Sequence, residues 1–331
     1  MEIEGIDAIL ISKPENVLYL TGKRTGRVLI SDDSSILWVK ELYREIHKDW
    51  YFHKNYNFDV RIYDDSLIEE EIRKMEIRNL GIENMSFRNY NRLEKKLQKK
   101  LVITDILEKQ RSVKSKYEIN LMKKSAEIAK KGMERAYEVI QEGVKELDAT
   151  AEIEYEIRKR GSETPPFKEG MLLASGASSA NIHATPGEKR IGDNELVVVD
   201  LGARFSNYYS DMTRTIALGD LNPRDELLLE SVKNLEMEAI DRVTPEVSAS
   251  EIHKFVERKI KSLGYKFYHS TGHGIGLEVH EIPNLGLDSE DILKEDMVFT
   301  IEPGIYIPKK FGIRFEDMIW LKKSSVEILT R

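Results

Sequence analysis

The stretch Glu195–Leu218 reads ELVVVDLGARFSNYYSDMTRTIAL. It contains two runs rich in β-branched and aromatic residues, Glu195–Ala203 and Tyr208–Leu218, on either side of a short polar turn. Such a pattern is typical of a β-hairpin. Asp200 and Asp211 each interrupt one of the two strands. In a hairpin without bulges whose turn lies midway between them, the two carboxylates face each other across the strands.

A second hairpin with a second pair of acids is predicted further along the chain. Glu302 lies in FTIEPG, Glu316 lies in RFEDM, and the midpoint Lys309 falls in the turn-like segment PKKFG. Four carboxylates on sheet interiors repel one another, and each costs several kcal/mol to remove from water. Divalent metal ions are the natural partners of such a cluster. The alternative is that each acid pairs with its own arginine or lies at a sheet edge.

The positions of the histidines support a metal site. His269, His273 and His280 lie in YHSTGHGIGLEVHE, where three glycines around His273 allow a close approach of the backbone. His183 lies in SGASSANIHATP, a polar segment suited to a functional loop. The other three histidines are interpreted as surface or boundary residues: His47, His53 and His253.

A ligand set of four carboxylates and one imidazole contains no sulfur. It favours manganese, cobalt, iron or magnesium over a structural zinc. Four carboxylates also balance the charge of two divalent ions, and a dinuclear site of this kind can generate a bridging hydroxide. The remaining histidines could then stabilise an oxyanion and shuttle a proton.

The composition excludes several classes of protein. The chain has 331 residues, which corresponds to about two domains, and no run approaches ~18 consecutive apolar residues. It has no cysteine, which excludes disulfides, thiolate metal sites and a cysteine nucleophile. Its net charge of -7 argues against nucleic acid as a partner, and its acidic start does not resemble a secretory signal. We therefore expect a cytoplasmic protein that binds neither nucleic acid nor membrane.

The pattern along the chain divides it into two domains. The first ~110 residues alternate strands and helices, with strands predicted at Ile6–Ser12, Arg27–Ile30 and Ile36–Lys40. After a boundary near Gln110–Lys114, the capping box Ser115–Glu118 opens a long helix. The order that follows is two helices, strands, two helices and strands again. It predicts two similar halves around a mostly antiparallel sheet, which is an α+β domain.

Five motifs resemble those of the pita-bread metallopeptidases, which include aminopeptidase P, prolidase and methionine aminopeptidase. They are VVVDLGA, SDMTRT, TGHGIGLEVHE, TIEPGIYIP and RFEDM. The N-terminal segments IDAIL and PENVLYLTG resemble the creatinase-type N-terminal domain. The resemblance implies an α+β chain. A smaller creatinase-like α/β domain at residues 1–112 would precede a pita-bread (creatinase/aminopeptidase) catalytic domain at residues 113–331.

The resemblance implies two divalent metal ions per subunit, manganese or cobalt first and iron or zinc next. Asp200 would chelate one metal, and Asp211 and Glu316 would bridge both. His273 and Glu302 would hold the other metal.

The same resemblance assigns roles around the metals. Glu302 would also shuttle the proton of the bridging hydroxide, and His183 and His280 would bind the substrate carbonyl and the oxyanion. Supporting residues that orient ligands or touch substrate would be Arg314, Tyr306, Thr213, Phe167 and His269.

The N-terminal domain disfavours methionine aminopeptidase, and the intact ligand set disfavours creatinase. The function implied is hydrolysis of Xaa-Pro bonds. Xaa-Pro dipeptidase (prolidase) comes first, because the chain is compact, as in the prokaryotic dipeptidases, and Glu278–Glu281 resembles their version of that motif. The alternative is Xaa-Pro aminopeptidase (aminopeptidase P), which acts on longer peptides than the dipeptide, and a remote alternative is a non-catalytic binding protein on the same fold. The partners implied are Xaa-Pro dipeptides or short peptides with proline at the second position. Family dimers, in which one subunit's N-terminal domain caps the other's site, imply a homodimer.

Overall fold

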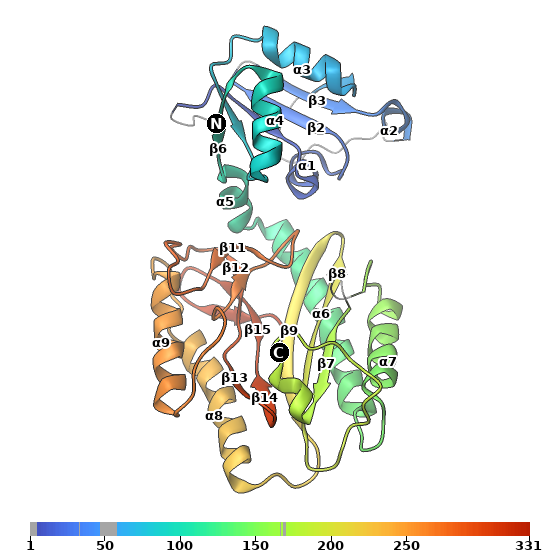
Figure 1. Cartoon of the computed structure of the whole chain (residues 1–331), viewed down its shortest axis with the longest axis vertical. Helices are drawn as coiled ribbons and strands as arrows, with labels where there is room; N and C mark the ends of the chain where they lie inside the picture. The colour runs from blue at the N-terminus through green and yellow to red at the C-terminus, as the bar shows by residue number, and fades with distance from the viewer. Residues whose placement is uncertain (1–4, 33, 47–57, 166, 168–169) are drawn as a thin grey trace. The chain divides into compact units, whose positions relative to one another are not determined.

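The computed structural model describes residues 5–32, 34–46, 58–165, 167 and 170–331. The chain forms two compact units, residues 1–110 and residues 111–331 (Figure 1). Among the described residues, no helix is both long enough and apolar enough to cross a membrane.

The first unit is a six-stranded sheet in the order β4-β3-β2-β1-β5-β6 with its own core. Its strands are β1 (Ala8–Ile11), β2 (Arg27–Ser31), β3 (Ser35–Val39), β4 (Asp59–Ile62), β5 (Asn79–Ile82) and β6 (Lys100–Ile103). Its helices are α1 (Pro14–Thr21), α2 (Glu41–Ile46), α3 (Asp65–Lys74), α4 (Phe87–Leu97) and α5 (Ile106–Ser112), which runs into the second unit. Strands β1, β2 and β3 confirm the three predicted strands.

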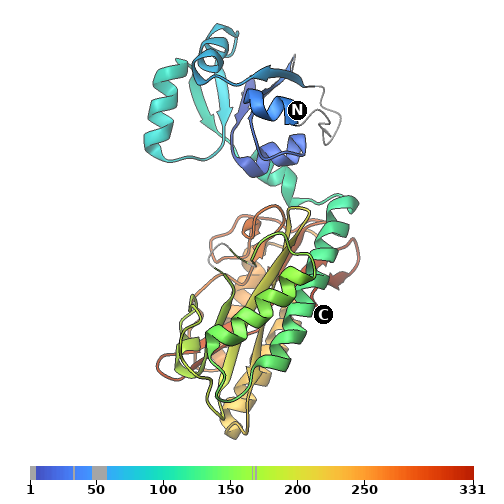
Figure 2. The same ribbon diagram turned by 90° about the vertical axis from the view of Figure 1, so that its right-hand side faces the viewer.

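The second unit begins with a helix pair that covers one face of a three-stranded sheet. Helix α6 (Lys116–Val139) starts at the predicted capping box, in which the Ser115 hydroxyl accepts from the Glu118 amide and Glu118 accepts from the Ser115 amide. Helix α7 (Glu146–Lys159) follows. The sheet consists of β7 (Leu172–Ser175), β8 (Leu196–Phe205) and β9 (Tyr208–Ala217), and a short 3₁₀ helix at Gly176–Ala180 follows β7. Figure 2 shows both helices lying along these strands.

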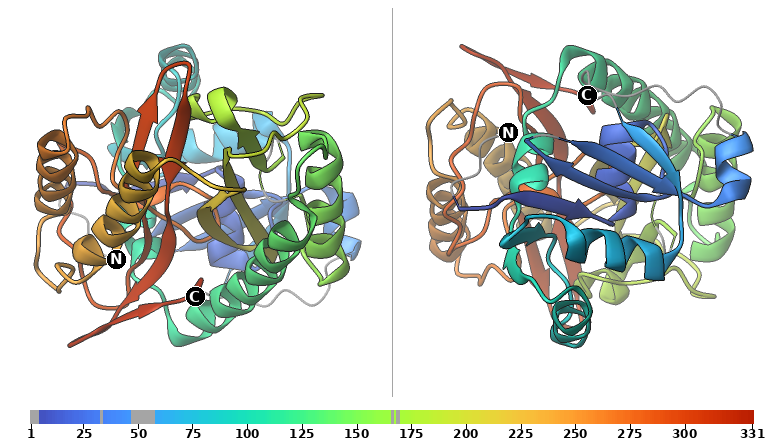
Figure 3. Two further views of the ribbon diagram at one scale, coloured as in Figure 1. Left: turned by 90° about the horizontal axis from the view of Figure 1, so that it is seen from below. Right: turned by 90° about the horizontal axis from the view of Figure 1, so that it is seen from above.

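A second helix pair and a second group of strands complete the unit. The helices are α8 (Pro223–Ile240) and α9 (Ala249–Ser262). The strands are β10 (His273–Gly274), β11 (Glu281–Asn284), β12 (Val298–Ile301), β13 (Gly304–Ile307), β14 (Phe311–Arg314), β15 (Asp317–Leu321) and β16 (Val326–Ile328). Seen from below in Figure 3, the two helix pairs lie on opposite sides of the strands.

The two halves repeat one plan, as predicted. Each has a helix pair on the outside of an antiparallel sheet, and each has its own apolar core. Alternation along the strands separates core from site: Val199 and Leu201 of β8 pack under α6 and α7, whereas Asp200 points to the opposite face. The α+β prediction for this unit is confirmed.

Candidate metal centre

The first pair of acids lies on one face of the β8–β9 hairpin, but in a register two residues away from the prediction. Asp200 pairs with Thr213, and Asp211 pairs with Gly202. The two carboxylates are therefore diagonal neighbours and not directly opposite each other. The reason is the tight turn at Ser206–Asn207, whose φ angles of 47° and 71° allow pairing up to Phe205 and Tyr208. Because side chains alternate with period two, a shift of two residues leaves both acids on the same face.

The second pair of acids lies in the predicted register. Strand β12 pairs with β15 from Val298↔Trp320 to Ile301↔Asp317, and β13 pairs with β14 from Gly304↔Arg314. Both pairings have the same register, so Glu302 and Glu316, which lie between them, are opposite each other. The turn at Lys309 has a φ of 65°, as a tight connection requires.

A backbone bridge joins the two hairpins at the site. Thr213 N donates to Glu316 O at 3.3 Å, and Glu316 N donates to Thr213 O at 3.0 Å. The Thr213 hydroxyl also donates to Glu316 Oε2 at 2.7 Å. The carboxylates of the two halves are thus brought together by main-chain hydrogen bonds, and their positions are fixed to one another.

His273 is placed on β10, where the glycines next to it allow a tight crossing of backbones. A Cβ at Gly272 would lie 1.9 Å from the carbonyl oxygen of Thr300, and one at Gly274 would lie 2.2 Å from that of Ile282. The predicted close approach around His273 is therefore confirmed. The ring Nδ1 lies 3.1 Å from the Gly274 carbonyl oxygen, so it carries the proton, and Nε2 presents its lone pair.

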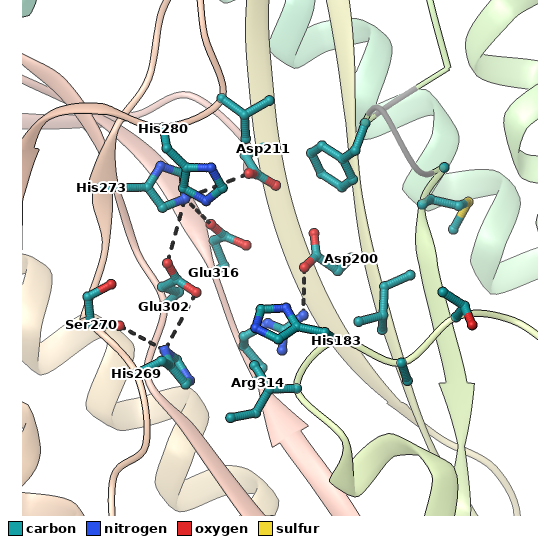
Figure 4. A pocket seen from close by; sticks show the side chains of 18 residues that line it. His183, Asp200, Asp211, His269, Ser270, His273, His280, Glu302, Arg314 and Glu316 are labelled. Atoms are coloured by element: carbon teal, nitrogen blue, oxygen red, sulfur yellow. Dashed lines mark hydrogen bonds and ion pairs between the residues drawn. The ribbon is translucent and has the colours of Figure 1, made fainter. Parts of the chain in front are cut away.

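Three carboxylates surround that lone pair (Figure 4). His273 Nε2 lies 3.6 Å from Glu302 Oε1, 3.9 Å from Asp211 Oδ2 and 4.0 Å from Glu316 Oε1. One donor atom each from Asp211, His273 and Glu316 lies within 4.8 Å of the others. Asp200 lies across the cavity, where its Oδ2 accepts from Arg314 Nη2 at 2.6 Å. The structure therefore gathers all five proposed ligands in one place, with Asp200 turned toward an arginine.

The protonation of these groups reflects crowding in a dry site. Burial, followed by the nearby carboxylates, raises the pKa of Asp211 and of Glu302 well above the usual values. Burial and Asp200 raise the pKa of Glu316 to about 7. Burial and His280 lower the pKa of His273 to about 3, so this imidazole is neutral. The neutral imidazole and the carboxylates form a donor set for a metal, and a bound cation would relieve the repulsion between the carboxylates.

Two carboxylate oxygens give a direct test of the fit to metal. Asp200 Oδ1 and Asp211 Oδ1 are buried and have no hydrogen-bond partner among the described residues. A buried carboxylate oxygen without a partner is costly. Both residues line the cavity together with the other donors. The residues present therefore fit divalent metal ions.

A hydrogen-bonded chain supports Asp200 from behind. Arg314 Nη1 donates to the Tyr306 hydroxyl oxygen at 3.0 Å, and Tyr306 Oη lies 2.9 Å from His269 Nε2. His269 Nδ1 lies 2.8 Å from the Ser270 carbonyl, so Nε2 is the acceptor and the tyrosine donates to it. Arg314 Nε also donates to the Thr213 hydroxyl at 3.2 Å. This series of hydrogen bonds thus orients ligands in both halves of the second unit.

The site opens into a cavity of about 480 Å³, a size common for small-ligand pockets. His183 and His280 line it together with the five proposed ligands, Arg314, His269 and Phe167. Tyr306 and Thr213 do not line it and act from behind through the bonds described above. Apolar side chains also contribute to the lining, among them Met171, Leu172, Ile182 and Val279.

Comparison with known proteins identifies the family. Residues 1–113 match the Creatinase/Prolidase N-terminal domain, and residues 120–323 match Metallopeptidase family M24. A Xaa-Pro dipeptidase of Pyrococcus horikoshii is 37% identical over 341 residues, which cover 100% of this chain and 94% of the relative. The chain belongs to metallopeptidase family M24. Membership of this family implies divalent metal ions, in agreement with the buried donors of the site.

Solved structures of family M24 share both units of the chain. Prolidase from Pyrococcus furiosus has a TM-score of 0.91 at 36% identity, covering 99% of this chain and 97% of the other. X-Pro aminopeptidase from Thermotoga maritima has a TM-score of 0.84 at 30% identity, covering 99% and 96%. The predicted combination of a creatinase-like N-terminal domain with a pita-bread catalytic domain is confirmed.

One prediction about the histidines of this M24 peptidase is wrong. His253 is buried, and its Nδ1 lies 3.1 Å from the hydroxyl of Thr271, whose carbonyl accepts from Glu302 N at 2.7 Å. It therefore lies behind the proposed ligand Glu302, with Thr271 between them. Its place on α9 between the core residues Ile252 and Val256 is a signal that could have shown its burial. His47 and His53 lie outside the described residues.

Proposed function

We propose that this protein is a dinuclear metallopeptidase that hydrolyses Xaa-Pro bonds, with Xaa-Pro dipeptides as the preferred substrates. The observation that carries the proposal is the convergence of four carboxylates and a neutral imidazole on one cavity, with Asp200 Oδ1 and Asp211 Oδ1 unpartnered among the described residues. Similarity over the full chain to a Xaa-Pro dipeptidase supports the substrate class.

The proposed ligands are those that the sequence predicts: Asp200, Asp211, His273, Glu302 and Glu316. Two divalent ions held there would activate water and polarise the scissile carbonyl. Oxygen-rich donors favour manganese or cobalt, with iron or zinc as alternatives. Asp200 would have to share its Oδ2 between metal and Arg314, or offer Oδ1 alone.

Side chains that line the cavity would stabilise the oxyanion and transfer the proton. His183 and His280 line the cavity and would donate to the substrate carbonyl as it becomes an oxyanion. Glu302 would take the proton of the attacking water and pass it to the proline nitrogen as the peptide bond breaks.

The test compares a dipeptide with its extended counterpart. Protein loaded with manganese or cobalt is assayed with Ala-Pro and with Ala-Pro-Ala at equal concentration. We expect a higher kcat/KM for the dipeptide. A preference for the longer peptide would favour the alternative, an Xaa-Pro aminopeptidase, which the similarity to the Thermotoga maritima structure supports. Hydrolysis of neither peptide by metal-loaded protein would favour the non-catalytic binding protein.

Two further predictions concern the whole protein. We propose a homodimer, as the family resemblance implies, and size-exclusion chromatography with light scattering measures its mass against the 38.3 kDa of one chain.

We also propose a cytoplasmic location, which the absence of cysteine supports. Fractionation of the native cells tests it.

A further inference from the structure

A cluster of four charged residues lies at the loop from Gly276 to Glu281, outside the metal centre. Arg111, at the end of α5, and Lys114, just before α6, have side chains that are 3% and 1% exposed. Arg111 Nη2 bonds to Glu281 Oε1 and lies 2.9 Å from Glu278 Oε2. Lys114 Nζ lies 3.5 Å from Glu281 Oε2. Two buried cations thus meet the buried carboxylate of Glu281, and Arg111 also meets the partly exposed carboxylate of Glu278.

The Glu281 carboxylate holds the loop that precedes it. Its Oε1 accepts from the backbone amide of Glu278 at 2.8 Å. A Cβ at Gly276 would lie 2.7 Å from Glu281 Oε2, so only glycine leaves room for the carboxylate. Gly276 N in turn donates to the Glu278 carbonyl at 3.0 Å. The loop from Gly276 to Glu281 is therefore folded around one carboxylate.

His280 lies in this loop and depends on it. Its ring makes no hydrogen bond to the described residues. The ring packs on that of His273 with centroids 4.2 Å apart and otherwise faces the cavity. The proposed role of His280 requires a fixed distance to the substrate carbonyl. With no hydrogen bond of its own, the ring takes its position from the backbone on either side.

We propose that Glu281, held by Arg111 and Lys114, is a positioning residue that fixes His280 in the geometry needed for oxyanion stabilisation. This inference rests on the role of His280 in the proposed function. Glu281 itself is not among the residues that line the cavity. Glu281 follows His280 directly in the chain, and its carboxylate holds the backbone of the loop that carries the histidine.

The charges of the cluster favour an ionised Glu281. Burial alone would raise its pKa, but Lys114 and Arg111 together lower it below the usual value. Loss of this charge would leave two buried cations with a weakened partner. Supporting groups of this kind commonly alter activity by about 10- to 100-fold when they are changed.

The test is a double-mutant cycle between Glu281 and His280. Glu281→Gln keeps the shape of the side chain and removes its charge, and we expect kcat for Ala-Pro to fall about 10- to 100-fold, with KM and bound metal nearly unchanged. His280→Ala should reduce kcat at least as much. In the double variant, we expect no loss beyond that of His280→Ala, because Glu281 has no histidine left to position.

A matched control separates positioning from stability. Glu83→Gln changes a buried carboxylate of the first unit that accepts from the amides of Ser12 and Lys13, both at 2.7 Å. It should lower the melting temperature while leaving kcat of the folded protein unchanged. Arg111→Lys is the second test variant should Glu281→Gln fail to fold. Lysine keeps the charge but lacks the planar guanidinium whose Nη2 contacts both carboxylates, so kcat should fall. In the His280→Ala background, Arg111→Lys should cause no further fall.

The outcomes distinguish this inference from the proposed function. If the losses of Glu281→Gln and His280→Ala multiply in the double variant, Glu281 does not act through His280 and the inference is overturned, while the proposed function stands. If His280→Ala leaves kcat unchanged, the role of His280 fails, and the inference fails with it. Lost metal in Glu281→Gln would also overturn the inference, because the carboxylate would then support the metal centre.

Discussion

Glu302 is the residue whose two proposed tasks, metal ligand and proton carrier, can be separated by one substitution. Glu302→Gln keeps an oxygen donor in place but cannot take up a proton at the carboxylate. We expect kcat for Ala-Pro to fall by about 10² to 10⁴, with an unchanged circular dichroism spectrum. The assay is steady-state hydrolysis together with elemental analysis of bound metal. A near-normal rate with full metal occupancy would exclude the proton-carrier role.

Glu316 predicts how the metal-free protein responds to pH. Its side chain is 2% exposed, and burial and Asp200 raise its pKa from 4.5 to about 7. The folded state therefore binds this proton more tightly than the unfolded state, so the free energy of unfolding falls as pH rises between these two values. A shift of this size corresponds to about 3 kcal/mol. Urea unfolding in EDTA at pH 5, 6, 7 and 8 measures it.

Glu316→Gln is the control that removes this carboxylate from the cluster. The difference in unfolding free energy between wild type and variant should grow in favour of the variant as pH rises from 5 to 8. Bound metal should abolish the dependence, because the cation then takes the place of the proton. A difference that stays constant with pH would show that Glu316 is not perturbed in the folded state.

At the scale of elements, the sequence predicts the two hairpins but not every register. Lys309 marks the second turn correctly, because the segment PKKFG is rich in turn residues. The first turn lies one residue later than the midpoint of Asp200 and Asp211, since Ser206 and Asn207 both adopt positive φ. The spacing of the two acids does not determine the position of the turn, which depends on the backbone conformation of Ser206 and Asn207. The shared face survives because the shift is an even number of residues.

The bridge between Thr213 and Glu316 could not be predicted from the sequence. It joins segments 103 residues apart, and no local pattern reports which strand edges meet. The same holds for the bond from Arg314 to Asp200. The resemblance to a known family gives Asp200 and Glu316 as ligands and Thr213 and Arg314 as supporting residues, but the contacts among them follow from how the two halves pack. The local sequence thus predicts which residues are present and on which face of a strand they lie. How these residues assemble into one site depends on tertiary packing.

Gly272 tests whether the close crossing at β10 is needed for the metal centre. Gly272→Ala would place a methyl group 1.9 Å from the Thr300 carbonyl oxygen, so one backbone must move. We expect a loss of about 3 kcal/mol, the upper end of overpacking costs, and weaker metal binding because Thr300 Oγ1 accepts from His273 N. Urea unfolding and metal titration measure the two effects.

Gly187→Ala is the matched control, because its Cβ would meet nothing closer than 3.8 Å. It should change the free energy of unfolding by less than about 1 kcal/mol. If both alanine variants behaved alike, the crossing at Gly272 would have room to relax, and its glycine would not be a requirement of the site.

At the scale of the molecule, the five proposed ligands all belong to residues 111–331 and come from both halves of that unit. Asp200 and Asp211 belong to the first half, and the other three ligands to the second. A metal bound by both halves has to be released before either half opens. It should therefore stabilise them together, while the first unit, which has its own core, gains nothing from it.

Hydrogen exchange followed by mass spectrometry tests this coupling on the full chain. At a metal concentration of 100 Kd the stabilisation is about 2.7 kcal/mol, or about 100-fold slower exchange through openings that release metal. We expect this slowing in peptides from β8–β9 and from β12–β15, and none in peptides from β1–β6. Glu316→Gln should reduce it in both halves at once. Slowing confined to one half would mean that the other opens with the metal still bound, and the five ligands would then not form one centre.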